Sequence, residues 1–169
     1  MSAVPNTQRL LSDASYAKID RELAKYPADQ RQSAVMAALA IAQVEKGWVS
    51  PEIIEDLARY IGMPPIAVHE VASFYNMYDT TQPGRFKLAV CTCLPCALRE
   101  GVAAGEYLKE KLGIDYNETT ADGMFTLKES ECLGACADSP VMLVNNQRMC
   151  SFMGAGEIDA LIDELRSKA

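Results

Sequence analysis

Four cysteines in two short pairs are the residues of this chain best suited to chemistry. The first pair lies in Cys91-Thr92-Cys93-Leu94-Pro95-Cys96 and the second in Glu131-Cys132-Leu133-Gly134-Ala135-Cys136. The spacings are C-x4-C and C-x3-C, with 35 residues between the pairs. Four thiolates supplied by two loops can hold one [2Fe–2S] cluster, with two sulfurs on each iron. On this interpretation the protein transfers single electrons and performs no bond chemistry of its own.

Other interpretations of these cysteines compete with the cluster. Zinc binds four thiolates at similar spacings, and the two gaps do not exclude a structural zinc module. Residues 93–96 also form a C-x-x-C between a predicted strand and a predicted helix, the position of the redox pair in a thiol–disulfide oxidoreductase. That function would leave Cys91, Cys132 and Cys136 without a role. Simple burial in a core, common for cysteine, does not account for two spaced pairs at equivalent strand ends.

The remaining cysteines and the histidine are assigned no ligand role. Cys93 is predicted to be a small loop residue or a reserve ligand, and Cys150 to pack in the core from a hairpin strand. His69 is the one histidine of the chain, far from both cysteine loops, and is expected to be a surface or capping residue. A metal site with four ligands must therefore be almost entirely sulfur.

Composition and charge indicate a soluble globular protein and exclude several classes. The chain has 169 residues, 49% apolar and 23% charged, enough for one ordinary domain or two small ones. Its net charge of −7 argues against nucleic acid and against an anionic membrane surface. No apolar run approaches the ~20 residues of a membrane span, and residues 1–10 lack signal-peptide features. Six cysteines without an export signal then indicate a reducing, cytoplasmic compartment.

The chain is expected to form two domains, residues 1–80 and 81–169. The turn cluster of residues 81–84 marks the boundary between them. Apolar residues at helical spacing predict a small helical bundle in the first part. Ser50 followed by Pro51 is an N-cap with proline in the first turn. The expected helices run from Ser12 to before Pro27, over about 29–46, over 51–61, and from Pro64-Pro65 toward Tyr75. The buried face of the second is expected to comprise Val35, Met36, Leu39, Ala42 and Val44.

The sequence of the second part predicts a sheet whose strands end shortly before the cysteine pairs. Strands are expected over residues 86–90 and 125–128, with a helix over 97–112 between them. Asn145-Asn146 predicts a hairpin turn, and residues 157–167 predict a closing helix. The order β-α-β-ββ-α resembles a thioredoxin-like sheet, so the chain is predicted to be an α+β protein with an N-terminal helical bundle. Both cysteine pairs would follow the carboxyl ends of parallel strands, where open α/β sheets bind ligands.

Several segments in the same order resemble a known family. They are Glu45-Lys46-Gly47-Trp48-Val49-Ser50, Val71-Ala72-Ser73-Phe74-Tyr75, Val90-Cys91 to Cys96, and Glu131 to Cys136. Together they resemble the 24-kDa-type subunit of NADH:quinone oxidoreductase (respiratory complex I), which in bacteria is the E-type subunit. The resemblance extends from about residue 15 to residue 167.

The resemblance implies the site and its surroundings. It implies a thioredoxin-like [2Fe–2S] domain whose ligands are Cys91, Cys96, Cys132 and Cys136, with no ligand role for Cys93. It also implies a tight pair with the flavin-binding 51-kDa-type (F-type) subunit, which holds FMN, NADH and a [4Fe–4S] cluster, and an association with the iron–sulfur G-type subunit. The cluster would exchange single electrons with that FMN, off the main electron path. The chain would then be peripheral on the inner membrane, part of a translocating oxidoreductase and without a complete active site of its own.

Related subunits serve NAD-dependent hydrogenases and formate dehydrogenases, and the cysteine motifs do not separate these enzymes. The full-length bundle favours the respiratory enzyme. The apolar side chains near the junction of the two parts are candidates for the surface that meets the flavin subunit; the alternative is an internal seam between the two parts. These residues are Phe74, Tyr75, Met77 and Tyr78.

Overall fold

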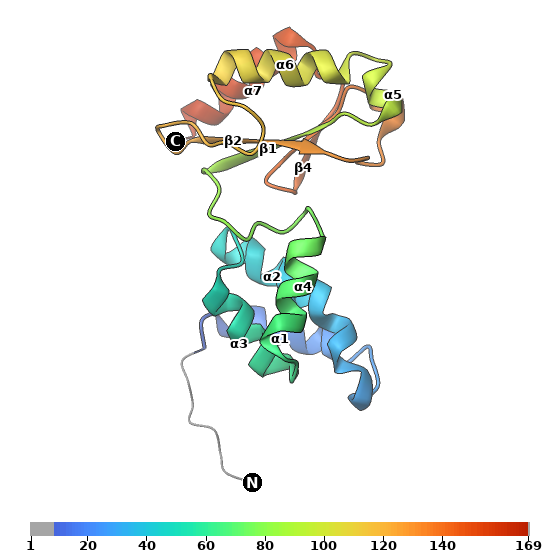
Figure 1. Cartoon of the computed structure of the whole chain (residues 1–169), viewed down its shortest axis with the longest axis vertical. Coiled ribbons are helices and arrows are strands. Elements are labelled where there is room, and N and C mark those ends of the chain that lie inside the picture. Colours follow the sequence, from blue (N-terminus) through green and yellow to red (C-terminus); the bar gives the residue numbers. More distant parts are fainter. Residues whose placement is uncertain (1–8, 169) are drawn as a thin grey trace. The chain divides into compact units, whose positions relative to one another are not determined.

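The computed structural model describes residues 9–168, which divide into two compact units between Gln82 and Pro83 (Figure 1). Residues 1–8, part of the stretch without signal-peptide features, lie outside the described residues, as does Ala169. Each unit has its own hydrophobic core. Among the described residues, no helix has both the length and the apolar composition needed to cross a membrane.

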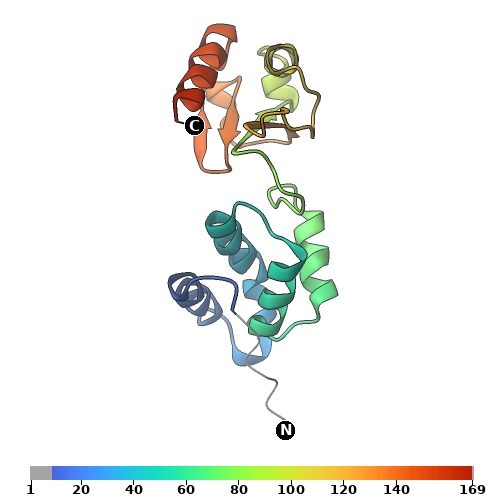
Figure 2. The same cartoon turned by 90° about the vertical axis from the view of Figure 1, so that its left-hand side faces the viewer.

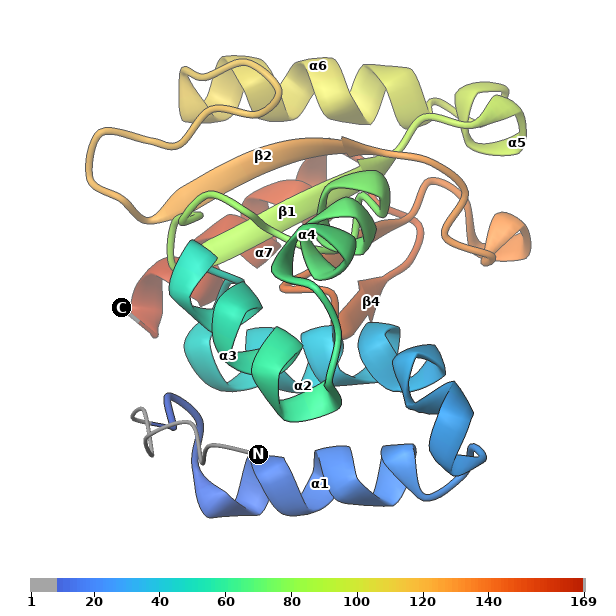
Figure 3. The same cartoon turned by 60° about the horizontal axis from the view of Figure 1, so that its bottom comes forward.

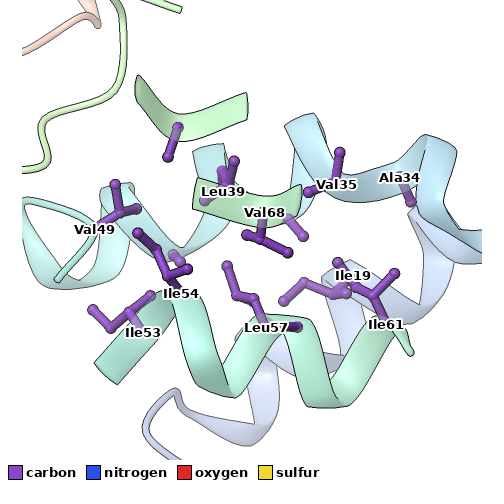
Figure 4. Close-up of a cluster of buried hydrophobic side chains, with 14 of the residues drawn as sticks. Ile19, Ala34, Val35, Leu39, Val49, Ile53, Ile54, Leu57, Ile61 and Val68 are labelled. Carbon is purple, nitrogen blue, oxygen red and sulfur yellow. The ribbon is translucent and has the colours of Figure 1, made fainter. Parts of the chain in front are cut away.

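The first unit is helical. Ser50 caps its third helix, since its hydroxyl accepts a hydrogen bond from the Ile53 N–H at 3.3 Å and Pro51 occupies the first turn. Apolar side chains from all four α-helices meet in the core, among them Ile19, Leu39, Leu57 and Val68 (Figure 4). Over residues 9–82 the elements are α1 (Asp13–Leu23), a 3-10 helix (Ala28–Ala34), α2 (Val35–Lys46), α3 (Pro51–Ile61) and α4 (Pro65–Phe74).

Two details of the predicted second helix are wrong. Residues 28–34 form a 3-10 helix with a non-helical Gln30, because no apolar side chain of this polar stretch before Ala34 is buried to hold an α-helical turn. Val44 is 65% exposed. It lies nine residues after Val35, and at 3.6 residues per turn this places it about 180° around the helix from that buried side chain.

A buried hydrogen-bond network connects residues 10–16 to α3. The Tyr16 hydroxyl donates to Asp56 Oδ2, which also accepts from the Leu10 N–H at 3.2 Å. Tyr16 and Asp56 are 2% and 5% exposed. Burial and the bond to Asp56 raise the pKa of Tyr16 to about 12, so its hydroxyl stays a donor at neutral pH. A second hydrogen bond between α1 and α3 is exposed to solvent: the Tyr60 hydroxyl donates to Asp20 at 2.6 Å.

Tyr16→Phe is therefore expected to lower the free energy of unfolding by about 2 kcal/mol, because a hydrogen bond to a buried carboxylate is lost. Urea unfolding followed by circular dichroism measures this loss. Tyr60→Phe is the matched control: it removes a hydroxyl from an exposed hydrogen bond and should change stability by less than about 0.5 kcal/mol. Equal effects of the two substitutions would contradict the role given to the buried pair.

The second unit is a mixed four-stranded sheet with helices on one face. The strand order within the described residues is β2-β1-β3-β4, with β1 and β2 parallel and the other pairs antiparallel. Both α6 and α7 cover the same face of this sheet (Figures 1 and 2). The elements are β1 (Phe86–Cys91), α5 (Leu94–Ala97), α6 (Gly101–Leu112), β2 (Phe125–Ser130), a 3-10 helix (Cys136–Asp138), β3 (Met142–Val144), β4 (Arg148–Cys150) and α7 (Ala155–Ser167).

The predicted order of strands and helices is confirmed in this unit, with one refinement. Asn145 and Asn146 both have positive φ, 52° and 57°, as a two-residue hairpin turn requires. The helix predicted over residues 97–112 is instead two: α5 ends at Ala97 and α6 begins at Gly101. Between them the chain turns through Glu100, whose φ is 68°.

The four apolar residues proposed for an interface or a seam do not behave alike. Tyr78 is 5% exposed, belongs to the core of the helical unit, and donates its hydroxyl to the Met36 carbonyl at 2.7 Å. Its inclusion in either surface is therefore wrong. Phe74 is 80% exposed, and Tyr75 and Met77 are about half as exposed as Phe74, at 39% and 40%.

Candidate metal centre

The strand register brings both cysteine pairs to one end of the sheet. Cys91 is the last residue of β1, and its parallel partner Ser130 is the last residue of β2. Cys132 follows two residues later. Figure 3 shows the segments after β1 and β2 leaving the sheet at the same end, on the right of the view. This is the carboxyl edge at which open α/β sheets bind ligands.

The first pair is buried. Cys91 and Cys96 are each 1% exposed and form a small cluster with Val141. Cys96 lies in the short helix α5, and Cys93 is its N-cap residue. The Cys91 N–H donates to the Val141 carbonyl at 3.1 Å, which ties the end of β1 to the segment that enters β3.

The second pair lies on an exposed loop that packs against the first. Cys132 and Cys136 are both exposed, but the intervening Leu133 and Ala135 contact the cluster of Cys91, Cys96 and Val141. Gly134 has φ 77°, a conformation that favours glycine, and its N–H lies 3.4 Å from Cys132 Sγ. The loop bends tightly at this glycine, and the bend turns a backbone N–H toward the Cys132 sulfur.

Hydrogen bonds and burial act in opposite directions on the first pair. Burial raises the pKa of Cys91, partly opposed by the backbone N–H groups of Cys93 and Leu133. Burial also disfavours ionisation of Cys96, but hydrogen bonds from the Ser139 hydroxyl and the Cys91 thiol outweigh it, so the pKa of Cys96 is lowered. Ser139 and Cys91 are therefore placed to donate to a thiolate at Cys96.

The second pair interacts internally and with the first. A hydrogen bond with Cys132 and burial raise the pKa of Cys136, and charge on Cys132, Cys96 or Cys91 would raise it further. Charge on one of these thiols therefore makes ionisation of the others less favourable, and a bound cation would remove that penalty. Over residues 9–168, no three His, Cys, Asp or Glu side chains are gathered around a single ion position. The thiols form two pairs, and two sulfurs on each of two irons are what a [2Fe–2S] cluster takes, so these residues fit that group.

The two remaining cysteines and the histidine lie in three different environments. Cys93 Sγ donates to Glu131 Oε2 at 3.1 Å, and this hydrogen bond raises the pKa of the thiol to about 11. Cys93 is therefore a neutral thiol at physiological pH. Cys150 is buried in the core of the sheet unit, as predicted. His69 is exposed on α4, as expected.

Two residues near the cysteines were not identified from the sequence. The Ser139 hydroxyl lies 3.2 Å from Cys96 Sγ. Gly101, the first residue of α6, packs directly on the backbone carbonyls of Cys91 and Cys96. A glycine shortly after a cysteine pair is a weak signal for such packing, whereas the sequence contains no signal that Ser139 faces a cysteine.

Fold and site together define a small protein with a thioredoxin-like sheet and two pairs of cysteine thiols at one edge of it, the class of a thiolate-bound iron–sulfur protein. The chain belongs to the thioredoxin-like [2Fe-2S] ferredoxin family, whose model matches residues 19–166. As a member of that family it carries one [2Fe–2S] cluster.

Curated relatives share about two fifths of their residues with this chain. NADH-quinone oxidoreductase subunit 2 of Thermus thermophilus is 39% identical over 149 residues, 88% of this chain and 82% of the relative. An E-type subunit of NADH-quinone oxidoreductase from Rhizobium meliloti is 39% identical over 150 residues, 89% of this chain and 88% of the relative. The mitochondrial NADH dehydrogenase [ubiquinone] flavoprotein 2 of Dictyostelium discoideum is 40% identical over 89% of this chain, and the match spans 61% of its length.

A solved structure confirms the fold. A chain of an NAD+-reducing [NiFe]-hydrogenase in the H2-reduced state superposes with a TM-score of 0.69 over 80% of this chain, at 24% identity. The match covers 22% of the hydrogenase chain. At this identity the likeness concerns the fold alone.

Proposed function

We propose that this chain is the [2Fe–2S] electron-transfer subunit of NADH:quinone oxidoreductase, respiratory complex I. The observation that carries the proposal is the pairing of four thiols at one edge of a thioredoxin-like sheet, in a chain about 40% identical to subunits of that enzyme over nearly its whole length. When bound, the cluster supplies reversible transfer of one electron.

In this proposal the ligands are Cys91, Cys96, Cys132 and Cys136. The buried first pair excludes water from one side of the site, and the N–H groups of Leu133 and Gly134 donate to sulfur. The exposed second loop is the side from which an electron donor can approach. Backbone donors and burial of this kind set the potential of a thiolate-bound cluster.

The partners follow from the proposed function. The electron donor is FMN on the 51-kDa-type (F-type) subunit, which also binds NADH, and the iron–sulfur G-type subunit lies in the same peripheral arm. The chain is then attached to the cytoplasmic side of the inner membrane through the assembly. It contributes electron transfer to a translocating oxidoreductase and holds no nucleotide itself.

Anaerobically purified protein is expected to be brown, with two irons and two acid-labile sulfides per chain and a rhombic EPR signal after one-electron reduction. Iron and sulfide assays on the sample that gives the spectrum test this. A colourless protein holding one zinc would support the structural zinc module. An iron-free protein that reduces insulin disulfides with dithiothreitol would support the thiol–disulfide oxidoreductase.

Purification of the tagged chain from native membranes separates the respiratory enzyme from its relatives. The complex is expected to oxidise NADH with a quinone as acceptor and to contain FMN. Recovery of a complex that instead oxidises hydrogen or formate with NAD+ would assign the chain to an NAD-dependent hydrogenase or formate dehydrogenase, and would overturn the respiratory assignment while leaving the cluster intact.

A further inference from the structure

The Ser139 hydroxyl lies between the two cysteine loops. Its oxygen is 3.2 Å from Cys96 Sγ in the first pair and 2.8 Å from the Cys136 carbonyl oxygen in the second. Ser139 is 2% exposed, so water does not compete for either contact. The hydroxyl thus gives Cys96, a proposed ligand, a hydrogen-bond partner that is not itself a cysteine.

The backbone holds this hydroxyl in place. The carbonyl before it, of Asp138, accepts from the Phe152 N–H at 2.8 Å, and the carbonyl after it, of Pro140, accepts from the Met153 N–H at 2.9 Å. The backbone around Ser139 is thus held by main-chain hydrogen bonds on both sides, and rotation about the Cα–Cβ bond is the remaining freedom of the hydroxyl.

The hydroxyl has one proton and two acceptors within reach. With Cys96 protonated, its thiol donates to the serine oxygen and the hydroxyl donates to the Cys136 carbonyl. A ligand cysteine is a thiolate without a proton. With Cys96 bound to iron, the proton of this contact comes from Ser139. The Cys136 carbonyl then loses the hydrogen bond from the hydroxyl but still accepts one from the backbone N–H of Ser139, at 3.4 Å.

We propose that Ser139 is a positioning residue that raises the reduction potential of the cluster by donating a hydrogen bond to the Cys96 sulfur. This rests on the function proposed above. On reduction the site gains one electron, from FMN in the enzyme or from dithionite in a titration, and the hydroxyl proton stays on Ser139. The added charge makes the sulfur a better acceptor, and a charge-assisted hydrogen bond is about twice as strong as a neutral one. The bond therefore favours the reduced form.

Ser139→Ala removes this donor with little change in volume. In an EPR-monitored titration of the isolated holoprotein, we expect the ratio of reduced to oxidised cluster at a given potential to fall about tenfold, which for a one-electron couple is a shift of about 59 mV to lower potential. Ser151→Ala is the matched control. The Ser151 hydroxyl donates a hydrogen bond at 3.1 Å to the side chain of Asp138, the residue directly before Ser139. This hydrogen bond does not involve a cysteine. The potential of the Ser151→Ala protein should equal that of the unmodified protein.

An unchanged potential in Ser139→Ala would overturn the proposal, as would an equal shift in Ser151→Ala. If Ser139→Ala fails to retain iron, Ser139→Thr decides, because it keeps the hydroxyl: the proposal requires both iron and the original potential to return. A threonine protein that loads iron but titrates at a potential lowered by the expected amount would also overturn it. Failure of the unmodified chain to bind iron would instead remove the proposed function.

Discussion

Cys132→Ala is expected to abolish the cluster, leaving the purified protein with almost no iron or sulfide. With the proposed ligand set, the substitution would leave one of the two irons with a single protein sulfur, and [2Fe–2S] clusters of this class need four thiolates. Cys132 is exposed on a loop, so the fold has little to lose by the change. The far-ultraviolet circular dichroism should therefore stay the same while the visible absorption and the EPR signal disappear. Cys96→Ala should lose the cluster as well.

Cys93→Ala is the matched control, since Cys93 lies in the same loop between two proposed ligands. Its thiol donates to Glu131, which keeps it neutral and directed toward a carboxylate. We expect the alanine protein to keep its full iron content. Loss of iron in Cys93→Ala together with retention in Cys132→Ala would replace Cys132 by Cys93 in the ligand set.

The features that followed from the sequence are those that depend on neighbouring residues. Ser50-Pro51 predicted the start of α3, Asn145-Asn146 predicted the hairpin, and the cysteine spacing predicted a candidate site whose two pairs the fold brings to one edge of the sheet. Both strands that lead into the cysteine loops could be placed because residues 86–90 and 125–128 are short segments with strand-forming residues, such as Val90 and Phe125, and each ends shortly before a cysteine pair. Their parallel pairing then brings both loops to one edge without any further information.

The features that did not follow depend on packing between distant residues. Ser139 is 43 residues from the Cys96 sulfur that it contacts, and nothing near it in sequence specifies that contact. Val44 is a different case, because its spacing of nine residues from Val35 already places it on the opposite side of α2, so the helical period alone accounts for its exposure. The break between α5 and α6, like the Ser139 contact, depends on how closely α6 approaches the first cysteine loop.

That close approach makes Gly101→Ala the second large effect expected. An added Cβ would lie 2.8 Å from the Cys96 carbonyl oxygen and 2.9 Å from that of Cys91. Both are backbone atoms that cannot rotate away, so either α6 or the cysteine loop has to move. Overpacking of this kind costs about 1–3 kcal/mol, and we expect a loss near the upper end, about 3 kcal/mol. Because the displaced atoms belong to two proposed ligands, iron content should fall as well.

Gly156→Ala provides the control, because Gly156 lies in the first turns of α7 with no atom within 4 Å of the added Cβ. Alanine there should raise the free energy of unfolding by about 0.4–1 kcal/mol, since it restricts the unfolded chain. Urea unfolding and iron assays on both proteins measure the difference. A Gly101→Ala protein with unchanged stability and full iron content would mean that α6 can withdraw from the first cysteine loop without disturbing it. The ligand geometry would then depend on the loop itself and on its contacts with the second pair, rather than on the helix that packs behind it.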